Sequence, residues 1–425
     1  MSHLTSNSTT ENKASHYDVV VVGGGAAGIA TSASLLNRQP DLNIVIIDPA
    51  NCHYYQPGWT LVGAGVFKAK QTVKPMADVI PKKATWVKHA IKYFKPAQNR
   101  VILSNNQTIN YEALVVAAGI KLDWAAIEGL PQALGRQGIT SNYSFELAPY
   151  TWKLVTQLQS GQAIFTQPTL PIKCAGAPQK ALYLSADHWL KHHRLNNIQL
   201  GFYNAGDTLF GVKEYVPALM QYIRKYSVNL FYKHNLTAVD ANSKTAIFTL
   251  TDSEGSQKNI EKPFDLLHVC PPQLAPDFIR NSPLADENGW LSVHSDTLQH
   301  TQYHNIFGVG DVCSTPNAKT AAAARKQAPV VAENVIHCLN GNNPTVAYNG
   351  YGSCPLTVEK GKIVLAEFLY GGKVSPTLPS WLNEGTQPSR LAWHLKHRVL
   401  PAVYWHGMLK GREWLAKPLL TQRKL

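Results

Sequence analysis

Features that place a chain across a membrane or outside the cell are missing from this sequence. No window reaches the ~18 consecutive apolar residues that a membrane-spanning helix needs. Residues 1–16 are polar, lack an apolar segment and are not rich in arginine, so they match neither a secretory signal nor a transit peptide. We expect a disordered leader over 1–16 and a folded chain that begins at Tyr17 and faces the cytoplasm.

Cysteine motifs are missing as well. None of the six cysteines forms C-x-x-C, which argues against a zinc ribbon, a thioredoxin-type pair and c-type haem attachment. In a reducing compartment all six are expected to be free thiols, so a disulfide here would be catalytic rather than structural. The cysteines are Cys52, Cys174, Cys270, Cys313, Cys338 and Cys354, of which Cys52, Cys270, Cys313 and Cys338 are predicted to be structural.

Histidines do not gather into a predicted metal site. The pairs His188/His192 and His300/His304 have helical spacing, but no third ligand converges on either pair in the sequence. We therefore predict surface histidines and no bound metal.

Acidic residues are scarce. The chain has 27 Asp and Glu against 40 Lys and Arg, a net charge of +13. This excess favours an anionic partner such as nucleic acid, anionic lipid or a small anion, although an ordinary basic surface gives the same balance. With 425 residues the chain is long enough for two or three domains.

The basic excess is strongest from Leu391 onward, where seven Lys and Arg residues are interleaved with aromatic residues and only one acidic residue, Glu413, occurs. Because Pro401 interrupts it, this pattern favours an amphipathic segment at a membrane surface rather than a spanning helix. Packing of the segment onto the protein core is an alternative. Nucleic-acid binding is less favoured, because no RNA- or DNA-binding motif accompanies the segment.

A glycine-rich motif follows the first predicted strand. The β-branched run Tyr17–Val22 leads into Gly23-x-Gly25-x-x-Gly28, and a helix is predicted over 26–38. A second strand, 43–48, ends at Asp48, 20 residues beyond Gly28, where a ribose-binding carboxylate belongs. The glycines let the backbone approach a pyrophosphate at the helix N-terminus. This combination predicts a dinucleotide-binding domain.

Two later segments support this prediction. One strand, 113–119, ends at Gly119, and another, 305–312, ends near Asp311 ahead of a small-residue helix from Lys319. An acid at a strand end beside a helix N-terminus can hold a ribityl or phosphate group. We therefore predict a discontinuous dinucleotide domain over 17–119 and 295–345, a second α/β domain over 120–294, and a C-terminal region over 346–425.

A second glycine fingerprint is missing where a nicotinamide site would require one. The predicted strand 163–166 leads into QPTLPIKCAGAPQK, which places Cys174 before a helix start near Pro178. A thiol at a helix N-terminus beside Lys173 has a lowered pKa, and its thiolate is a nucleophile. From this context alone an inert loop cysteine is equally compatible. Cys354, followed by Pro355, is a weak candidate by itself.

These segments together resemble sulfide:quinone oxidoreductase, in its two-cysteine, mitochondrial-like subgroup. The resemblance runs from about Tyr17 to about Pro418 and includes GGGAAG, HYYQPGWTLVGAG, KCAGAPQK, LFGVKEY, FGVGDV, KTAAA and GYGSCPL. It implies an α/β fold with two Rossmann-like domains, the second without a nicotinamide fingerprint, and an amphipathic C-terminal region that associates with membranes. It also implies a flavoprotein that oxidises hydrogen sulfide and passes two electrons through FAD to membrane quinone.

The resemblance assigns roles to individual residues. Cys174 and Cys354 would form the redox pair, bridged directly or through an extra sulfur, with a persulfide on Cys354 after sulfide attack. From their charge and position, rather than from the resemblance, Lys173 and Lys180 are expected to stabilise the thiolate or the anion of the reduced flavin. Quinone or membrane contacts are expected from Phe368, Trp393, Tyr404 and Trp405. The residues predicted to bind FAD are Gly23, Gly25, Ala26, Ala27, Gly28, Asp48, Gln56, Ile91, Gly119, Asp311, Lys319, Thr320, Ala321, Ala322, Ala323 and Ala324.

The implied partners follow from that reaction. A small sulfur acceptor, namely sulfite, glutathione or another thiol, or cyanide, would remove the sulfane sulfur, and no nucleic acid is required. The enzyme would be a peripheral (monotopic) protein on the cytoplasmic side of a bacterial inner membrane, or on the mitochondrial inner membrane in a eukaryote. A homo-oligomer is compatible with this reaction. Type II NADH:quinone oxidoreductase and flavocytochrome-type sulfide dehydrogenase are the alternatives. The former requires the missing fingerprint, and the latter requires a secretory signal and a haem partner.

Overall fold

The computed structural model describes residues 15–252 and 254–421 of the chain. The first strand, β1, begins at Ser15, two residues before the expected start. The remainder of the expected leader, 1–14, lies outside the described residues, as do the last basic residues of the tail, Arg423 and Lys424.

The first sheet forms because short β-branched runs such as Val19–Val22 and Ile44–Ile47 are buried on both faces, as in parallel sheets covered by helices. Its strand order is β5-β2-β1-β8-β7-β6, and β19 pairs with β8 in parallel, 190 residues later in the sequence. The strands are β1 (Ser15–Val22), β2 (Ile44–Ile47), β5 (Thr85–Val87), β6 (Ile91–Lys95), β7 (Arg100–Leu103), β8 (Thr108–Val116) and β19 (Ile306–Gly308).

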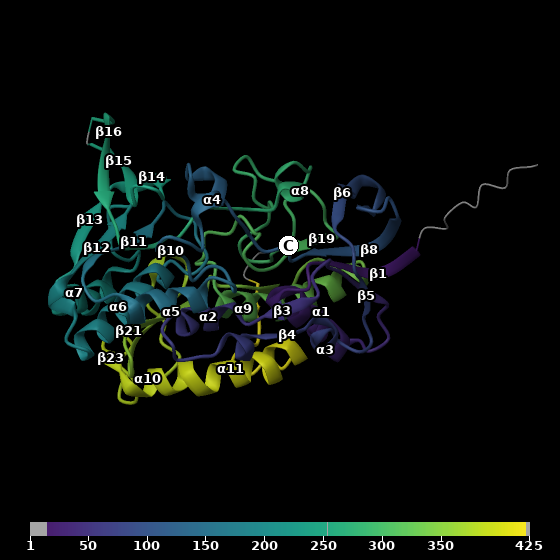
Figure 1. The fold of residues 1–425 in the computed structure, drawn as a ribbon. Coiled ribbons are helices and arrows are strands. Elements are labelled where there is room, and N and C mark those ends of the chain that lie inside the picture. Colours follow the sequence, from purple (N-terminus) through teal and green to yellow (C-terminus); the bar gives the residue numbers. More distant parts are fainter. Residues whose placement is uncertain (1–14, 253, 422–425) are drawn as a thin grey trace, which may run out of the picture.

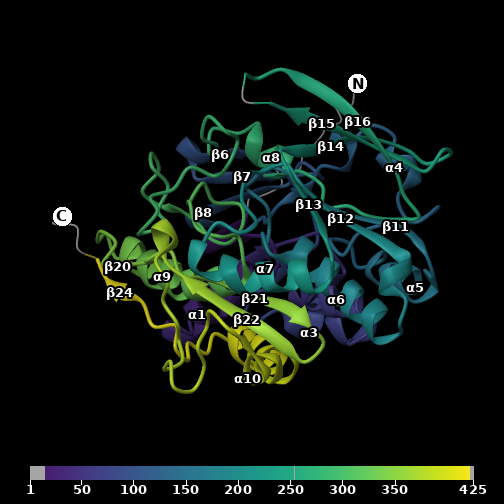
Figure 2. The ribbon, with the colours of Figure 1, turned by 90° about the vertical axis from the view of Figure 1, so that its left-hand side faces the viewer.

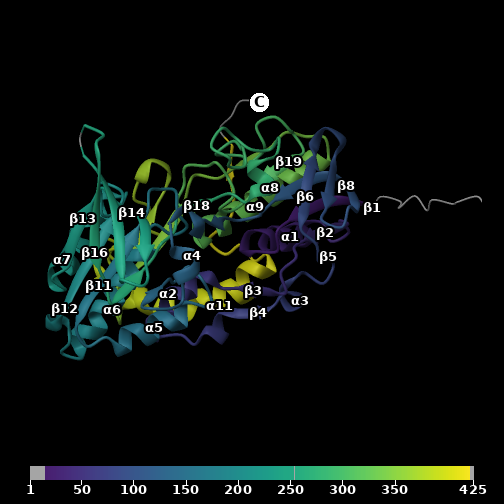
Figure 3. The ribbon, with the colours of Figure 1, turned by 45° about the horizontal axis from the view of Figure 1, so that its top comes forward.

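A second sheet lies beside the first (Figure 3). Its five strands run in the order β10-β17-β11-β12-β13 and are all parallel. They are β10 (Ile139–Thr140), β11 (Gly161–Gln167), β12 (Ile198–Asn204), β13 (Asn229–Tyr232) and β17 (Leu266–His268). An antiparallel sheet extends from this lobe and contains β14 (His234–Asp240), β15 (Thr245–Thr251) and β16 (Gln257–Pro263).

Helices cover both sheets. α1 and α9 pack against each other beside the first sheet, with Ile29, Leu35 and Val331 in one buried cluster. The helices are α1 (Ala26–Arg38), α2 (Trp59–Val62), α3 (Met76–Val79), α4 (Leu130–Ala133), α5 (Ala148–Gln157), α6 (Ala177–Lys191), α7 (Val216–Lys225), α8 (Asp277–Arg280) and α9 (Ala321–Leu339). The prediction of a helix over 26–38 is confirmed.

The C-terminal part adds a third small sheet and a long helical stretch. The sheet contains β21 (Gly352–Glu359), β22 (Lys362–Phe368) and β23 (Pro388–Ser389), and β21 packs on α6 (Figure 2). The helical stretch then runs along the underside of the body (Figure 1). It consists of α10 (Arg390–His394), a π-helical turn η8 (Leu395–Val399), α11 (Leu400–Ala402), a second π-helical turn η9 (Val403–Gly407) and the 3₁₀ turn η10 (Met408–Lys410).

Short antiparallel pairs complete the structure. They are β3 (Cys52–Tyr54) with β4 (Val73–Pro75), β9 (Lys121–Leu122) with β18 (Gln273–Leu274), and β20 (Val346–Ala347) with β24 (Leu419–Leu420). Within 15–252 and 254–421, no helix is long and apolar enough to cross a bilayer. The domain boundaries given above remain predictions.

Candidate functional site: a dinucleotide cavity beside a cysteine pair

A cavity of about 450 Å³ is lined by residues from both lobes of the molecule, the one built on the first sheet and the one built on the second. The parts of the chain that line it include the glycine-rich turn after β1, the start of α9, the loop before α6, and the C-terminal helical stretch. The first three are segments that the sequence singles out, and the fourth was predicted to face a membrane.

The glycine-rich turn is held in a shape that only glycine allows. A Cβ built on Gly28 would lie 1.9 Å from the carbonyl oxygen of Gly23, so any side chain there would force α1 away from β1. A Cβ on Gly25, in contrast, meets no atom within 4 Å. Gly25 thus leaves the backbone open at the N-terminus of α1, where a phosphate group can approach.

Asp48 lines the cavity and also braces this turn. Its Oδ2 accepts a hydrogen bond from the N–H of Gly24 at 2.6 Å, and its Oδ1 accepts one from Ala50 at 2.7 Å. Asp48 is therefore fixed beside the glycine turn. Its predicted contact with a ribose remains a prediction.

Asp311 follows β19 and lines the cavity. Burial raises the pKa of Asp311, while the nearby ammonium groups of Lys319 and Lys173 oppose the rise. The Lys319 ammonium donates hydrogen bonds to the carbonyl oxygens of Asp311 and Cys313, at 2.8 Å each, and does not line the cavity. The structure therefore places Lys319 as a brace of the strand end, which differs from its predicted place in the FAD site.

The start of α9 is capped by Thr320, whose hydroxyl accepts a hydrogen bond from the N–H of Ala323 at 3.1 Å. Thr320, Ala321, Ala322 and Ala324 line the cavity as the sequence predicts, whereas Ala323 packs into the core. The small side chains keep the helix N-terminus accessible.

The residues around the cavity fit a bound flavin dinucleotide. Among the described residues, several buried polar atoms have no hydrogen-bond partner, and three of the side chains concerned line this cavity: Thr60, Asn142 and Arg325. Unpaired buried polar groups are costly, so their clustering here indicates a polar ligand. Together with the open Gly25 backbone and the two helix N-termini, they match the polar groups of FAD.

The cysteine pair lies at the edge of this cavity. Cys174 comes from the loop before α6 and Cys354 from β21, and their Sγ atoms are 3.6 Å apart. The Cys174 backbone lies in the left-handed region, with φ of +51°, and its N–H donates to the carbonyl of Lys319 at 2.8 Å. The fold thus brings together two cysteines that are 180 residues apart in the sequence.

Cationic groups surround the two sulfur atoms. The Lys180 ammonium, carried by α6, donates to Cys174 Sγ at 3.0 Å and is fully buried. The hydrogen bond from the Cys354 thiol, with the charge of Lys180 adding to it, holds the pKa of Cys174 well below its usual range. That same hydrogen bond and burial raise the pKa of Cys354. The geometry therefore favours a thiolate on Cys174 and a thiol on Cys354.

Lys173 lines the cavity but makes no hydrogen bond to the Cys174 sulfur, and its expected role toward a reduced flavin stays a prediction. Its ammonium donates to Oε1 of Gln56 and lies over the ring of Trp59, 5.1 Å from the centroid. Its carbonyl accepts a hydrogen bond from the Tyr143 hydroxyl at 3.0 Å. Lys180, rather than Lys173, contacts the Cys174 sulfur.

Lys396 is a site residue that the sequence analysis missed. It lies in η8 with 3% of its surface exposed, lines the cavity, and donates to the carbonyl of Pro57 at 3.1 Å. Burial and the charge of Lys180 lower its pKa to about 8. A sequence signal existed, because Trp393, Leu400 and Val403 lie three, four and seven positions away and give this lysine an apolar helical neighbourhood.

Other predicted residues lie away from the cavity. Ile91 belongs to the core cluster on the other face of the first sheet. Phe368, Trp393 and Trp405 are buried at 9% exposure each, and only Tyr404 of the four predicted quinone or membrane residues lines the cavity. Gly23 and Gly28 shape the turn without lining the cavity, whereas Gln56, Gly119, Ala26 and Ala27 line it as predicted.

The prediction of surface histidines is wrong for His300. This side chain is 3% exposed, and its Nε2 lies 3.2 Å from the carbonyl oxygen of Leu284, because it packs into the loop ahead of β19. In the described part of the chain, no group of three or more His, Cys, Asp or Glu side chains could hold a metal ion.

Comparison with known proteins decides the family. Residues 17–170 match the model of the pyridine nucleotide-disulphide oxidoreductases. The mitochondrial sulfide:quinone oxidoreductase of Dictyostelium discoideum is 42% identical over 95% of this chain and 88% of that protein. The mouse mitochondrial protein is 38% identical over 93% of this chain and 87% of its own length. The chain belongs to the sulfide:quinone oxidoreductase family.

Solved structures agree on the fold. The crystal structure of the sulfide:quinone oxidoreductase from Aquifex aeolicus superposes with a TM-score of 0.76 at 21% identity, over 96% of this chain and 98% of that one. NDH2 from Plasmodium falciparum, solved with NADH, gives a TM-score of 0.62 at 12% identity. At these identities the likeness concerns the fold alone, which this chain shares with a protein solved in complex with NADH.

Proposed function

We propose that this chain oxidises hydrogen sulfide and passes two electrons to a quinone, with FAD held in the cavity between the two lobes. The relatives with the highest identities quoted above carry that activity in their names. The single observation that supports the chemistry is the Cys174–Cys354 pair with the Lys180 ammonium beside it, at the edge of the cavity that the glycine-rich turn lines.

The first step uses the sulfur atoms of the chain alone. In the oxidised enzyme Cys174 and Cys354 are bridged, and hydrosulfide attacks the sulfur of Cys354. A sulfur–sulfur bond forms on Cys354, the bridge breaks, and Cys174 leaves as a thiolate. The leaving sulfur is that of Cys174, whose pKa is lowered, and a thiol with a lower pKa leaves faster. The Lys180 ammonium lies beside this sulfur and stabilises the thiolate that forms. The sulfide is oxidised to the persulfide level as the bridge is reduced.

FAD, when bound, supplies a two-electron acceptor that can hand the pair on to a quinone. The chain's residues hold the reacting sulfur at the cavity edge, where Lys180 and Lys396 favour its thiolate form. An acceptor then removes the outer sulfur from Cys354 and leaves a second thiolate, and the bridge would form again as the two thiolates give two electrons to the bound FAD. Sulfite, thiolates and cyanide are nucleophilic anions, and the net charge of +13 favours their approach.

The same site argues against a nicotinamide reductase. Residues 168–176 between β11 and α6 contain a single glycine, Gly176, and a Cβ built there would meet Leu356 Cδ2 at 2.2 Å and Cys354 Sγ at 2.6 Å. Side chains from β21 therefore cover the place where a pyrophosphate would approach the start of α6. This disfavours the NADH-dependent alternative.

We also propose that the underside of the molecule associates with a membrane surface. Exposed apolar residues between 381 and 400 include Trp381 at 83%, Val399 at 44% and Leu391 at 37%, with Arg390 and Arg398 among them in the sequence. Apolar side chains flanked by basic ones suit the boundary between headgroups and acyl chains. The tail aromatics predicted to do this, Trp393 and Trp405, instead pack against the body.

Serine substitution of each cysteine tests the chemistry. The variants C174S and C354S should retain FAD, because neither sulfur holds the dinucleotide, yet should lose sulfide-dependent quinone reduction by at least ~10³-fold, since the covalent route is removed. Cys338 is the control, because it lies on α9 away from the site, and C338S should keep wild-type turnover. Activity near wild type in both site variants would show that the redox pair is wrongly assigned.

A further inference from the structure

The C-terminal segment, defined here as residues 390–414, forms one wall of the dinucleotide cavity. Lys396, Leu400, Val403, Tyr404 and Met408 all line it. Two of its turns are π-helical, and they carry Lys396, Val403 and Tyr404. Such turns shift the side-chain register of a helix and often occur at functional sites. The segment is thus built to present specific side chains to the cavity.

The first attachment of this segment passes through a buried histidine. His53 is 2% exposed, its Nδ1 lies 3.0 Å from the carbonyl oxygen of Gly24, and its Nε2 lies 2.6 Å from the Tyr404 hydroxyl. A carbonyl oxygen only accepts, so Nδ1 carries the proton and donates. Burial lowers the pKa of His53, which keeps the ring neutral. Nε2 therefore accepts, and the Tyr404 hydroxyl donates to it.

This arrangement connects the segment to the glycine-rich turn itself. The N–H of Gly24 donates to Asp48 while its carbonyl accepts from His53, so both polar groups of this peptide position are fixed. Gly24 is the middle residue of the Gly23-x-Gly25 turn. A displacement of Tyr404 would leave the buried Nε2 of His53 without its partner and would loosen the turn at the point where a pyrophosphate approaches.

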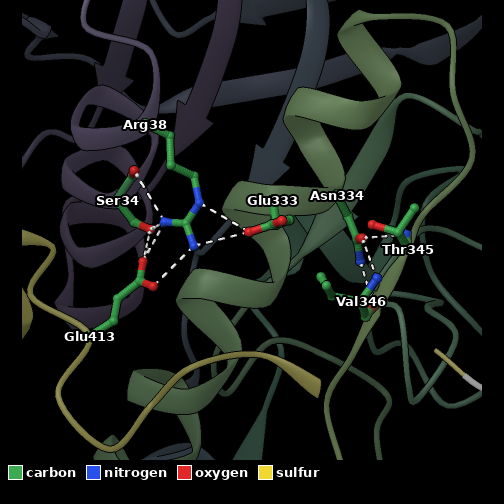
Figure 4. Close-up of polar contacts among 7 residues, drawn as sticks. All are labelled: Ser34, Arg38, Glu333, Asn334, Thr345, Val346 and Glu413. Atoms are coloured by element: carbon green, nitrogen blue, oxygen red, sulfur yellow. Dashed lines mark hydrogen bonds and ion pairs between the residues drawn. The ribbon is translucent and has the colours of Figure 1, made fainter. Parts of the chain in front are cut away.

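A second attachment lies at the other end of α1. Arg38 donates hydrogen bonds to both carboxylate oxygens of Glu413 and also pairs with Glu333 of α9 (Figure 4). The Ser34 hydroxyl donates to the same Glu413 carboxylate at 2.6 Å. These side chains are largely buried, with 23% of Arg38 and 20% of Glu413 exposed. Glu413 is the only acidic residue in a basic segment, and here it faces an arginine.

Residues 410 and 411 of the segment pack closely against α1. The Asn37 side chain donates to the carbonyl oxygens of Lys410 and Gly411 at 3.0 and 3.1 Å. Gly411 has φ of +66°, and a Cβ built there would lie 2.7 Å from backbone atoms of Ala33 and Ser34. The segment therefore contacts the C-terminal half of α1 directly, and it is connected to the turn before α1 through His53.

We propose that residues 390–414 are an integral part of the dinucleotide site, in which His53, Tyr404, Arg38 and Glu413 are positioning residues that hold the glycine-rich turn, α1 and the cavity wall in one arrangement. This inference rests on the proposed function only in naming FAD as the ligand. It changes what removal of the segment would mean, because deletion from Arg390 takes away a wall of the cofactor site together with any membrane surface.

The test measures FAD release from the purified holoenzyme, followed by the rise in flavin fluorescence after dilution. Y404F removes the hydroxyl that His53 accepts from, and E413A removes the carboxylate between Ser34 and Arg38. Each should release FAD about tenfold faster, as expected for a buried polar group left unpaired. The controls are Y93F and E384A, in exposed side chains away from the cavity, and both should release FAD at the wild-type rate.

A double variant tests the Tyr404–His53 link itself. H53N keeps an N–H donor toward Gly24 but loses Nε2, so H53N/Y404F should release FAD no faster than the faster of the two single variants. Limited proteolysis of the holoenzyme should cut Y404F and E413A sooner within 390–414. Wild-type release rates in Y404F and E413A, or additive effects in the double variant, would overturn the proposal. Neither readout uses sulfide or quinone. Failure of the proposed function would be seen in a separate experiment, in which sulfide does not reduce the flavin of the wild-type protein.

Discussion

Replacement of Lys180 by methionine should slow the reaction with sulfide about 100-fold. The Nζ–Sγ distance of 3.0 Å to Cys174 corresponds to a Coulomb attraction of about 5.5 kcal/mol at an effective dielectric constant of ~20. Burying the two charges offsets part of this, and loss of one partner from a buried pair costs roughly 3 kcal/mol net. Each 1.4 kcal/mol changes a rate about tenfold, which gives the expected factor of ~100. Methionine keeps the volume of the side chain, so packing around α6 is retained.

Two measurements check this expectation. Stopped-flow absorbance follows flavin reduction by sulfide at pH 7, and absorbance of the thiolate follows the titration of Cys174 in the reduced protein. In K180M the thiolate should form only at higher pH, because the cation that favours it is gone. The control is K153M on α5, an exposed lysine, which should behave as wild type. A K180M rate within threefold of wild type, with an unchanged titration, would refute the role of Lys180.

Two other predictions concern Lys396 and the underside of the molecule. Because its pKa is lowered to about 8, Lys396 is charged below that pH and neutral above it. The K396M variant should therefore react with sulfide more slowly than wild type below pH 8 and at the wild-type rate well above pH 8. A constant ratio of the two rates from pH 6 to 10 would contradict this. Replacement of the exposed Trp381 and Val399 by serine should lower binding to anionic vesicles at least ~10-fold in a sedimentation assay, because ~2 kcal/mol of apolar burial is lost per large side chain. The exposed Leu420 is the control, and equal binding of L420S and W381S/V399S would argue against this surface.

The first half of the cofactor site could be predicted from the sequence because it is built locally. A β-branched strand, a glycine turn and a helix follow one another within 24 residues, and each has a distinct residue pattern. The helix bounds 26–38 and the cavity positions of Gly25 and Asp48 follow from those patterns, whereas Ala26 was assigned by the resemblance. Cys174 was recognisable for a similar reason, since it interrupts a pattern whose remaining parts are present.

The other half depends on long-range packing, which local residue patterns indicate only weakly. Lys396 belongs to a basic, aromatic run that matches a surface segment by composition, yet its helix packs beneath the cavity and buries the ammonium. Lys173 is one residue and Lys180 six residues from Cys174 in the sequence, yet the fold brings the Lys180 ammonium to the sulfur and directs Lys173 toward Gln56. Ile91 was assigned to the cavity by resemblance, but its strand places it on the opposite face of the sheet.

The most direct test of the proposed reaction compares two reductants on one sample of purified protein. Flavin absorbance is followed in a stopped-flow instrument after mixing with sulfide, and separately after mixing with NADH, in the absence of oxygen. The account predicts that sulfide bleaches the flavin rapidly and that quinone then restores its colour, whereas NADH leaves the flavin oxidised. Rapid bleaching by NADH, with no response to sulfide, would contradict it.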